Sequence, residues 1–404
     1  MLRKPVFWIG FSLFSLLCTY FAYQSFSSAF PIVNLDLKMD RSLALETARS
    51  LAEEQGFGPD EFDQAASFGV NGAVQTFVEL EAGGTEAFAE MILGDLYSPF
   101  TWSVRHYREG ETTETMFWFT PAGKPYGFRH ALPEDQPGAS LPVAEARTIA
   151  EEAATSTWGI DLTPFALVEE SQELRLGGRT DHSFVYERTQ EKIGEGQYRL
   201  RLTVSGDRLS GLMHFIKIPE SFSRRYEEMR SFINSIASAA ALIGGILFMG
   251  GGCCFGLFVL MRARWVIWKA PLLWGGFIAF LGFLSGLNEL PLMWMSYDTA
   301  VAAQGFLIDQ IVRIAGSALM MGLIMTISFM AAESLTRKAF PGQLQFWKTW
   351  SAGSANTSTV LGQSLTGFLL VGIFFAYEVI LYFVTTRYLD WWTPSSALFH
   401  PDSL

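Results

Sequence analysis

The stretch Met261–Lys269, which reads MRARWVIWK, decides how the rest of the chain is interpreted. It lies between two uncharged apolar runs, Ile233–Val259 and Ala270–Leu287. Each run is close to the ~20 apolar residues that cross a bilayer as a helix. The stretch itself holds three basic residues, two tryptophans and no acid. Because Lys and Arg collect on the cytoplasmic side and Trp at the headgroup level, we interpret it as a tight cytoplasmic turn between two spanning helices.

Three further apolar runs complete a prediction of five spans: Val6–Tyr23, Ile311–Ala332 and Thr359–Val384. Each is long enough to cross the hydrocarbon core of a bilayer. The first run follows Arg3 and Lys4, and it is either an uncleaved anchor or a signal peptide. In both cases the block that follows it is exported.

The charges between the runs agree with this topology. The segment Asn288–Gln310 has three acidic residues and no Lys or Arg, which suits an external loop. The segment Glu333–Ser358 has three basic residues and suits the inside. Arg387–Pro394, with two adjacent tryptophans, reads as an interfacial belt on the outer side. The Lys and Arg distribution therefore predicts a multi-pass membrane protein with its large amino-terminal block outside the cytoplasm.

The exported block is acidic and free of cysteine. Residues 31–232 hold 19 basic and 33 acidic residues, whereas the chain as a whole has a net charge of −11. An acidic surface argues against nucleic acid as a partner. Because the block has no cysteine, it has neither a disulfide framework nor a cysteine-based zinc site. The lipid bilayer is the partner that the apolar runs indicate.

A repeat divides the exported block. Ala48–Glu54 (ARSLAEE) returns as Ala146–Glu152 (ARTIAEE), and both copies have the spacing of an amphipathic helix. Asp40 and Ser42 are candidate caps for the first helix and Ser140 for the second. Alternating β-rich segments follow each copy; they are residues 100–107 and 116–120 in the first, and 184–186 and 198–204 in the second. Each copy then turns at a glycine, Gly123 or Gly206, which can adopt the positive φ that short hairpins need.

This arrangement resembles the PepSY-like fold, in which a helix packs on a few antiparallel strands, often in pairs, outside bacterial membranes. The resemblance implies a bacterial inner-membrane protein whose exported domain binds a peptide or protein ligand. The predicted fold class is therefore a membrane protein with an α-helical bundle of about five spans and an exported α+β domain made of two PepSY-like repeats. The expected divisions are an amino-terminal anchor or signal (1–30), a first repeat (31–135), a second repeat (136–232), a four-span region (233–387) and an interfacial tail (388–404).

Ionisable residues within the spans are the first place to look for function, because a charge in hydrocarbon is costly. Glu378 lies inside the last run, where it could bond to another helix or serve an active cavity. Asp309 and Arg313 are four residues apart and can pair on one helix face. The histidines His106, His130, His182 and His214 lie in the exported block and form no metal-binding motif. We interpret them as surface or strand residues.

The segment Ala331–Arg337 (AAESLTR) invites comparison with a family of enzymes. Together with Phe346–Ser351 and Tyr388–Pro394 it resembles the amino-terminal portion of large bacterial CPBP-family proteins, which are intramembrane metalloproteases related to the CAAX prenyl endopeptidases. The family's active site begins with Glu-Glu-x-x-x-Arg and continues with histidines on later spans. Here Glu333 and Arg337 match the second Glu and the Arg, whereas Ala332 replaces the first Glu and the next histidine is His400.

Glu333 and Arg337 are thus the only catalytic candidates, and we predict no metal ligand and no cofactor site in this chain. The resemblance places the family's catalytic core after Leu404, so zinc is expected only in a longer product. It implies that the chain is the regulatory or sensory portion of a CPBP-type intramembrane metalloprotease. The alternative is a non-enzymatic PepSY-type envelope sensor or an accessory protein of a transporter.

Overall fold

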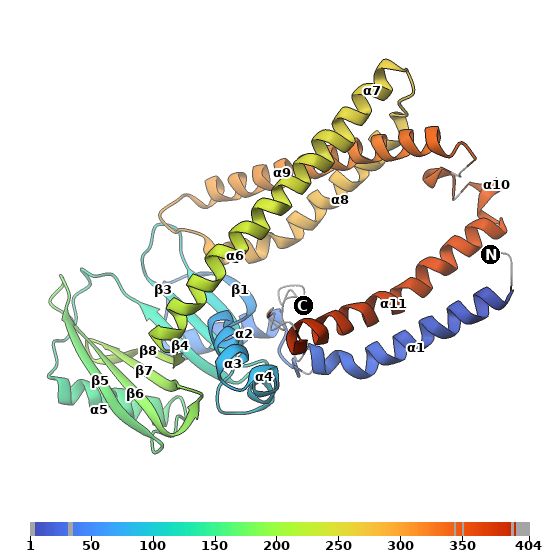
Figure 1. Ribbon diagram of the computed structural model, residues 1–404. Helices are drawn as coiled ribbons and strands as arrows, with labels where there is room; N and C mark the ends of the chain where they lie inside the picture. Colours follow the sequence, from blue (N-terminus) through green and yellow to red (C-terminus); the bar gives the residue numbers. More distant parts are fainter. Residues whose placement is uncertain (1–4, 31–34, 343–344, 350, 389–391, 393–404) are drawn as a thin grey trace. The chain divides into compact units, whose positions relative to one another are not determined.

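The computed structural model describes residues 5–30, 35–342, 345–349, 351–388 and 392 (Figure 1). The chain forms two compact units. The helical unit contains residues 1–24, 224–290 and 307–381. The second unit, called the sheet domain below, contains residues 25–223, 291–306 and 382–404. The sheet domain therefore includes residues 291–306, which the sequence analysis assigned to the four-span region.

Five helices of the described chain are long and apolar enough to cross a membrane. They are α1 (Pro5–Ala29), the continuous stretch of α6 (Glu220–Ile246), the π-helix η2 (Leu247–Phe255) and α7 (Gly256–Arg262), then α8 (Lys269–Met293), α9 (Ala303–Ala339) and α11 (Ser358–Tyr388). Short elements connect them: η3 (Trp294–Ser296), η4 (Phe346–Lys348) and α10 (Ala352–Ala355). The chain is thus a multi-pass membrane protein, as the five apolar runs predicted.

The turn predicted at Met261–Lys269 is present. Helix α7 ends at Arg262 and α8 begins at Lys269. Within the turn, Arg264 has a positive φ of 58°, and the N–H of Ile267 donates to Ser334 Oγ of α9 at 3.1 Å. The predicted external loop, in contrast, is wrong in extent. Helices α8 and α9 cover most of residues 288–310, because α8 continues past Leu287 to Met293 and α9 already begins at Ala303.

Small residues bring the long helices together. Gly275 and Gly286 of α8 lie against Thr326 and Ile314 of α9, where an added Cβ would come within 1.8 and 2.5 Å of a side chain. Between α1 and α11, the hydroxyl of Ser15 donates to the carbonyl of Leu369 at 2.6 Å. Close approach at small residues and hydrogen bonds between helices are what hold helices together in lipid, where the hydrophobic effect does not act between them.

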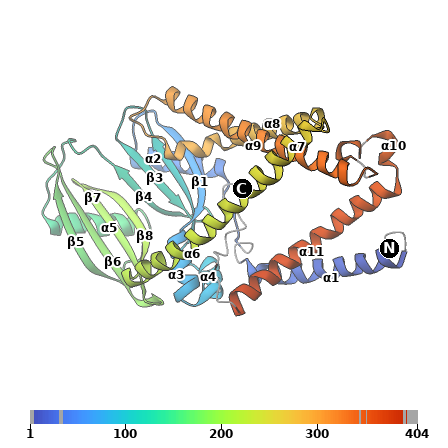
Figure 2. The same cartoon turned by 45° about the horizontal axis from the view of Figure 1, so that its top comes forward.

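One antiparallel sheet of eight strands forms the sheet domain, in the order β1-β2-β3-β4-β8-β7-β6-β5. The first half contributes β1 (Asp63–Val70), β2 (Phe100–Tyr107), β3 (Glu114–Phe119) and β4 (Pro125–Ala131). The second half contributes β5 (Phe165–Leu174), β6 (Thr180–Ile193), β7 (Gly196–Ser205) and β8 (Arg208–Lys217). Figure 2 shows the two halves side by side, joined where β4 meets β8. Both predicted repeats thus contribute four consecutive strands to a single sheet.

Each half begins with a helix that packs through alanines. Helix α2 (Arg41–Gln55) buries Ala44, Ala48 and Ala52, and α5 (Val143–Ser156) buries Ala146, Ala150 and Ala154. Residues four apart share one helix face, so these alanines form a flat ridge. Helix α2 lies on β1 and β2, and α5 lies on β6, β7 and β8 (Figure 1). Beneath the ridges, the sheet buries a core of large side chains: Phe68, Trp102, Phe117, Phe119, Phe128, Phe184, Leu200, Leu202 and Leu212.

The two capping predictions had different outcomes. Asp40 caps α2 as expected, since its carboxylate accepts from the N–H of Leu43 at 2.8 Å. Ser140 does not cap α5, which is preceded instead by Pro142 without a side-chain cap. The Ser140 hydroxyl is hydrogen-bonded to Thr180 at 2.7 Å. The glycine turns are confirmed, because Gly123 and Gly206 have φ values of 88° and 67° between β3 and β4 and between β7 and β8.

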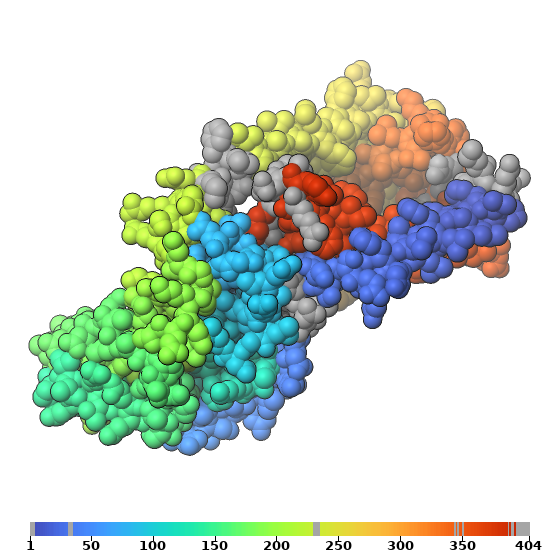
Figure 3. All heavy atoms as spheres, turned by 60° about the horizontal axis from the view of Figure 1, so that its bottom comes forward, coloured from blue at the N-terminus to red at the C-terminus, as the bar shows by residue number. Residues whose placement is uncertain are grey.

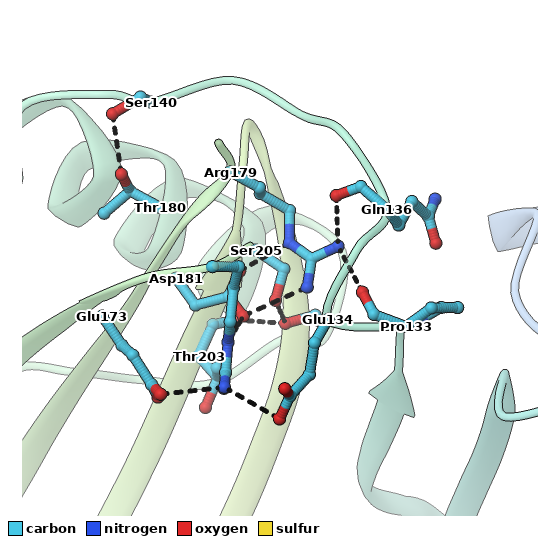
Figure 4. A network of polar contacts seen from close by, with 12 residues as sticks. Pro133, Glu134, Gln136, Ser140, Glu173, Arg179, Thr180, Asp181, Thr203 and Ser205 are labelled. Carbon is cyan, nitrogen blue, oxygen red and sulfur yellow. Dashed lines mark hydrogen bonds and ion pairs between the residues drawn. The ribbon is translucent and has the colours of Figure 1, made fainter. Parts of the chain in front are cut away.

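A buried arginine fastens the connection between the halves to the second half (Figure 4). The guanidinium of Arg179 donates to the carbonyls of Pro133 and Gln136, each at 3.2 Å, and pairs with Asp181 at 2.8 Å. Its side chain is 3 % exposed. Arg175 adds ion pairs to Asp181 at 2.8 Å and to Glu134 at 3.7 Å. The carbonyls of the connection, which has no regular structure, are therefore satisfied by a charged donor.

Two helices that the sequence analysis did not predict lie between β1 and β2. They are α3 (Gly72–Glu81) and α4 (Gly84–Leu93). Phe77 of α3 contacts Phe222 edge to face at 5.2 Å. Gly194 in the turn between β6 and β7 lies against Ala82, so the pair contacts the second half (Figure 3).

Candidate functional site

A pocket of about 220 Å³ lies in the sheet domain where β4 and β8 diverge. In the part of the chain that the structure describes, only two residue pairs join these strands, Phe128 with Leu212 and Arg129 with Gly211. Beyond them, Tyr126 and Gly127 of β4 and residues 213–215 of β8 line the pocket. Gly127 is required here, because an added Cβ would lie 2.5 Å from the carbonyl oxygen of Leu212. The pocket therefore sits at the joint between the two halves.

The walls of the pocket are aromatic and uncharged. Trp118 of β3 and Phe215 of β8 contribute rings, Met213 a thioether and Thr101 of β2 a hydroxyl. Residues 97–99 and Asn71 complete the lining. No lining residue in the described chain is acidic or basic at neutral pH, since His214, the one titratable base, has its pKa lowered to about 4 by burial, with the charge of Lys124 as a second cause.

A chain of hydrogen bonds links three residues of the lining through Tyr198. The N–H of Ser98 donates to the Tyr126 hydroxyl at 3.2 Å, Tyr126 is hydrogen-bonded to Tyr198, and the Tyr198 hydroxyl is 2.7 Å from His214 Nδ1. Because Ser98 donates at one end, we assign each hydroxyl as the donor to the next group. Nδ1 of His214 is then an acceptor and Nε2 carries the proton. Burial raises the pKa of Tyr126, so these groups stay neutral across the physiological range.

The ring of His214 stacks on Tyr126 at 4.5 Å. Tyr97 contacts Tyr126 and Tyr198 edge to face at 6.3 and 5.8 Å. The aromatic wall is therefore fixed by ring contacts as well as by hydrogen bonds, which is the pre-organisation that a binding site needs.

A second feature lies on the same strand as the pocket. Arg105 of β2 is four residues from Thr101, so the two side chains leave the same side of the strand about 13 Å apart. The guanidinium of Arg105 donates to the carbonyls of Met295 at 3.2 Å and Tyr297 at 2.6 Å, and it pairs with Glu114. Residues 291–306 connect α8 to α9, so this arginine holds the connection between two membrane-spanning helices.

Aromatic packing and backbone bonds strengthen this contact. Tyr297 is 2 % exposed and contacts Tyr107 of β2, Trp294 and Phe306 at ring-centroid distances of 5.0–5.5 Å. Thr299 is bonded twice, because its carbonyl accepts from Gly110 N–H at 2.8 Å and its hydroxyl donates to Glu111 O at 2.7 Å. The connection is thus an integral part of the sheet domain. We call residues 291–306 the docked connection.

The residues singled out by the family resemblance lie elsewhere, at the end of α9. Glu333 and Arg337 are bonded to each other at 2.9 Å, four residues apart on one helix. Their side chains are 12 % and 27 % exposed. Within the described chain, no group of three His, Cys, Asp or Glu side chains is placed to hold a metal ion. The pair has the geometry of an ion pair within a helix.

The other sequence candidates are also separate from the pocket. Asp309 and Arg313 form the predicted pair, at 2.7 Å on exposed α9. Glu378 is half-buried on α11. His400 lies outside the described residues. Among the described residues, the candidates from the sequence meet only in two pairs, Asp309 with Arg313 and Glu333 with Arg337.

The strand histidines are not surface residues. His106, His130 and His182 are 0, 9 and 1 % exposed. Burial lowers the pKa of His106 to about 3 and that of His130 to about 4, with the charges of Arg49 and Arg208 as the respective second causes. His130 Nδ1 is 2.8 Å from Thr115 Oγ1. The prediction of strand positions was right, whereas the surface alternative was wrong.

Neither a protein-family model, nor a curated protein, nor a solved structure matches the chain. The arrangement of its own residues therefore carries the functional argument. The sequence analysis did not find the pocket, because its lining comes from five separate segments. A partial signal was present, because Tyr97 lies just before the predicted strand at 100–107 and Tyr198 begins the predicted strand at 198–204.

Proposed function

We propose that the chain is a membrane-anchored envelope sensor, whose exported sheet domain binds a peptide or protein ligand at the pocket and signals to the membrane through the docked connection. The contact of Arg105 with the carbonyls of Met295 and Tyr297 carries this proposal. A contact that served the fold of the sheet alone would not need the connection between α8 and α9. The partners of this function are the bilayer and the ligand.

The pocket and the docked connection can influence each other through the sheet. Trp118 of β3, which lines the pocket, pairs with Ser103 on the neighbouring strand β2. Ser103 lies on β2 between Thr101 and Arg105. A ligand that moves Trp118 or the start of β2 therefore acts on the strand that holds the connection. Coupling of this kind requires a physical element that both sites bias, and β2 is that element.

Localisation in a bacterial inner membrane, with the sheet domain outside, belongs to the same proposal. The distribution of Lys and Arg supports the orientation, and the resemblance to PepSY-like and CPBP-family proteins supports the bacterial membrane. The PepSY-like identity of the two halves is supported by their shared order of a helix followed by four antiparallel strands, with α3 and α4 inserted between the first two strands of the first half. The more specific version, a regulatory portion of a CPBP-type protease that would hold zinc in a longer product, is supported by the resemblance around Glu333 and Arg337.

The coupling can be tested without knowing the ligand, by filling the pocket covalently. The substitution Thr101→Cys is introduced into a chain whose three cysteines are changed to alanine, and the thiol is reacted with benzyl methanethiosulfonate. We expect hydrogen exchange in residues 291–306 to change on labelling. In a chain that also carries Arg105→Met, the same label should leave that exchange unchanged.

The matched control is the same label at Leu174→Cys on β5, where the native side chain is 71 % exposed and remote from the pocket lining. A label at Thr101→Cys that alters residues 291–306 no more than the label at Leu174→Cys would refute the proposed coupling.

A further inference from the structure

The lining of the pocket points to a specific class of ligand group. We propose that the pocket binds an uncharged aromatic side chain of a polypeptide ligand, and that a backbone carbonyl of this ligand accepts a hydrogen bond from His214. This inference rests on the pocket being the ligand site of the proposed sensor, and it adds the chemistry by which the ligand is recognised.

Size is the first argument. The pocket measures about 220 Å³. A cavity of ~150 Å³ lined by apolar side chains is large enough to hold benzene. The pocket therefore accommodates one aromatic ring with the first atoms of its backbone, and it is too small for a drug-sized ligand, which occupies at least about 300 Å³.

The second argument is the chemistry of the walls. Trp118, Tyr126 and Phe215 supply aromatic rings to the lining, and Met213 adds a polarisable sulfur. Aromatic rings pack favourably on such surfaces in stacked or edge-to-face geometry, and thioethers add favourable contacts with rings. A charged side chain would lose its hydration in the pocket without meeting an opposite charge, which is costly.

The third argument is that His214, the one titratable base in the lining, can donate a hydrogen bond to a ligand. Nδ1 of His214 is occupied by the Tyr198 hydroxyl, so Nε2–H is the group that His214 has to offer a ligand. A donor selects an acceptor, and the carbonyl of a peptide bond is the commonest acceptor on a polypeptide. The site thus combines an apolar seat with one orienting polar group, as ligand pockets usually do.

The position of the pocket adds a consequence for the ligand. It lies where the ladder between β4 and β8 stops after two residue pairs. A ring seated there touches residues of both halves, Trp118 and Gly127 of the first and Met213 and Phe215 of the second. The ligand therefore bridges the joint of the sheet.

Binding can be measured directly with the full chain in lipid nanodiscs. The probe is N-acetyl-4-fluoro-L-phenylalanine methylamide, observed by fluorine NMR, with empty nanodiscs to subtract partitioning into lipid. We expect saturable broadening of the probe signal. Unlabelled N-acetyl-L-phenylalanine methylamide should displace the probe, whereas N-acetyl-L-glutamate methylamide should not.

Three variants locate the binding. Trp118→Ala removes a wall, and we expect the affinity to fall by about tenfold or more, the loss that one aromatic contact and its buried area support. Met213→Trp fills the pocket and should abolish binding. Leu174→Ala on exposed β5 is the matched control and should bind as the unmodified chain does.

Three results would overturn the inference. They are the absence of saturable binding to the unmodified chain, an affinity of Trp118→Ala and Met213→Trp as high as that of the unmodified chain, or displacement of the probe by the glutamate compound as effective as by the phenylalanine compound. The binding result is separate from signalling, because the probe signal reports occupancy of the pocket and not the state of residues 291–306. Probe binding without any change in residues 291–306 would therefore refute the sensor and leave the ligand assignment intact.

Discussion

Replacing Tyr297 with alanine should release the docked connection from the sheet. Tyr297 is 2 % exposed, its ring packs against Tyr107, Trp294 and Phe306, and its hydroxyl donates to the carbonyl of Val301. Removing a large buried aromatic side chain costs about 3–5 kcal/mol. Because the ring joins Tyr107 of the sheet to Trp294 and Phe306 of the docked connection itself, we expect that cost to fall on the local folding and docking of the connection, while the rest of the sheet stays folded.

The amide of Gly110 reports the docked state, since its hydrogen bond to the carbonyl of Thr299 exists only when the connection is in place. A loss of 3 kcal/mol corresponds to a factor of more than a hundred in an equilibrium constant. Hydrogen exchange at Gly110, measured by mass spectrometry on the full chain in nanodiscs, should accelerate by at least about a hundredfold, or until it reaches the intrinsic rate of the free amide.

Tyr297→Phe is the matched control. It keeps the ring and loses one hydrogen bond, worth about 1 kcal/mol, so exchange at Gly110 should rise by about fivefold. If Tyr297→Ala and Tyr297→Phe gave the same exchange, or if β6 and β7 lost protection together with Gly110, the reasoning that docking is local and held by this ring would be refuted.

Three other outcomes follow from the fold. Burial lowers the pKa of His130 to about 4, below the value of about 6.5 in an unfolded chain. The contribution of neutral His130 to stability is therefore complete above pH 6.5 and is lost as the pH falls toward 4. In His130→Gln, the free energy of unfolding, measured with guanidinium and near-ultraviolet circular dichroism, should fall less steeply between pH 6 and pH 4. Arg179→Ala leaves Asp181 and two carbonyls short of a buried donor, and the same measurement should show a loss of about 3–5 kcal/mol, against no change for exposed Leu174→Ala. Reporter fusions should show opposite sides of the membrane for two pairs of positions, outside at Pro137 and Asp298 and inside at Arg264 and Lys348, and one fusion on the wrong side would contradict the five-span topology.

Hydropathy and charge were sufficient to predict the five long helices and the turn at Met261–Lys269, because lipid imposes the same length and flanking pattern on every span. They did not predict where helices α8 and α9 end. Residues 288–293 and 303–310 are less apolar than the spans, yet they stay helical, and residues 291–306 belong to the sheet domain, where Trp294 and Tyr297 find partners.

In the sheet domain, local periodicity predicted the two repeat helices and strands β2, β3, β6 and β7. Strand β5 was not predicted, because it is an edge strand whose glutamate-rich sequence is mostly exposed and shows no alternation of apolar residues. Ser140 failed as a cap because Thr180, forty residues later, competes for its hydroxyl. The pocket brings β8 against strands β2, β3 and β4, which lie far earlier in the chain, and a single sequence holds no direct signal for such contacts.

The order of the strands also determines how the sheet can form as the chain is made. Five of the seven neighbouring strand pairs are hairpins between consecutive strands, and β1 and β2 are separated only by α3 and α4. Contacts that are local in sequence form faster than distant ones, so each four-stranded half can form soon after its own residues emerge. The pairing of β4 with β8 is the one step that must wait for a distant partner, and it spans two residue pairs. The joint at which the pocket lies is therefore expected to close late, after both halves have formed.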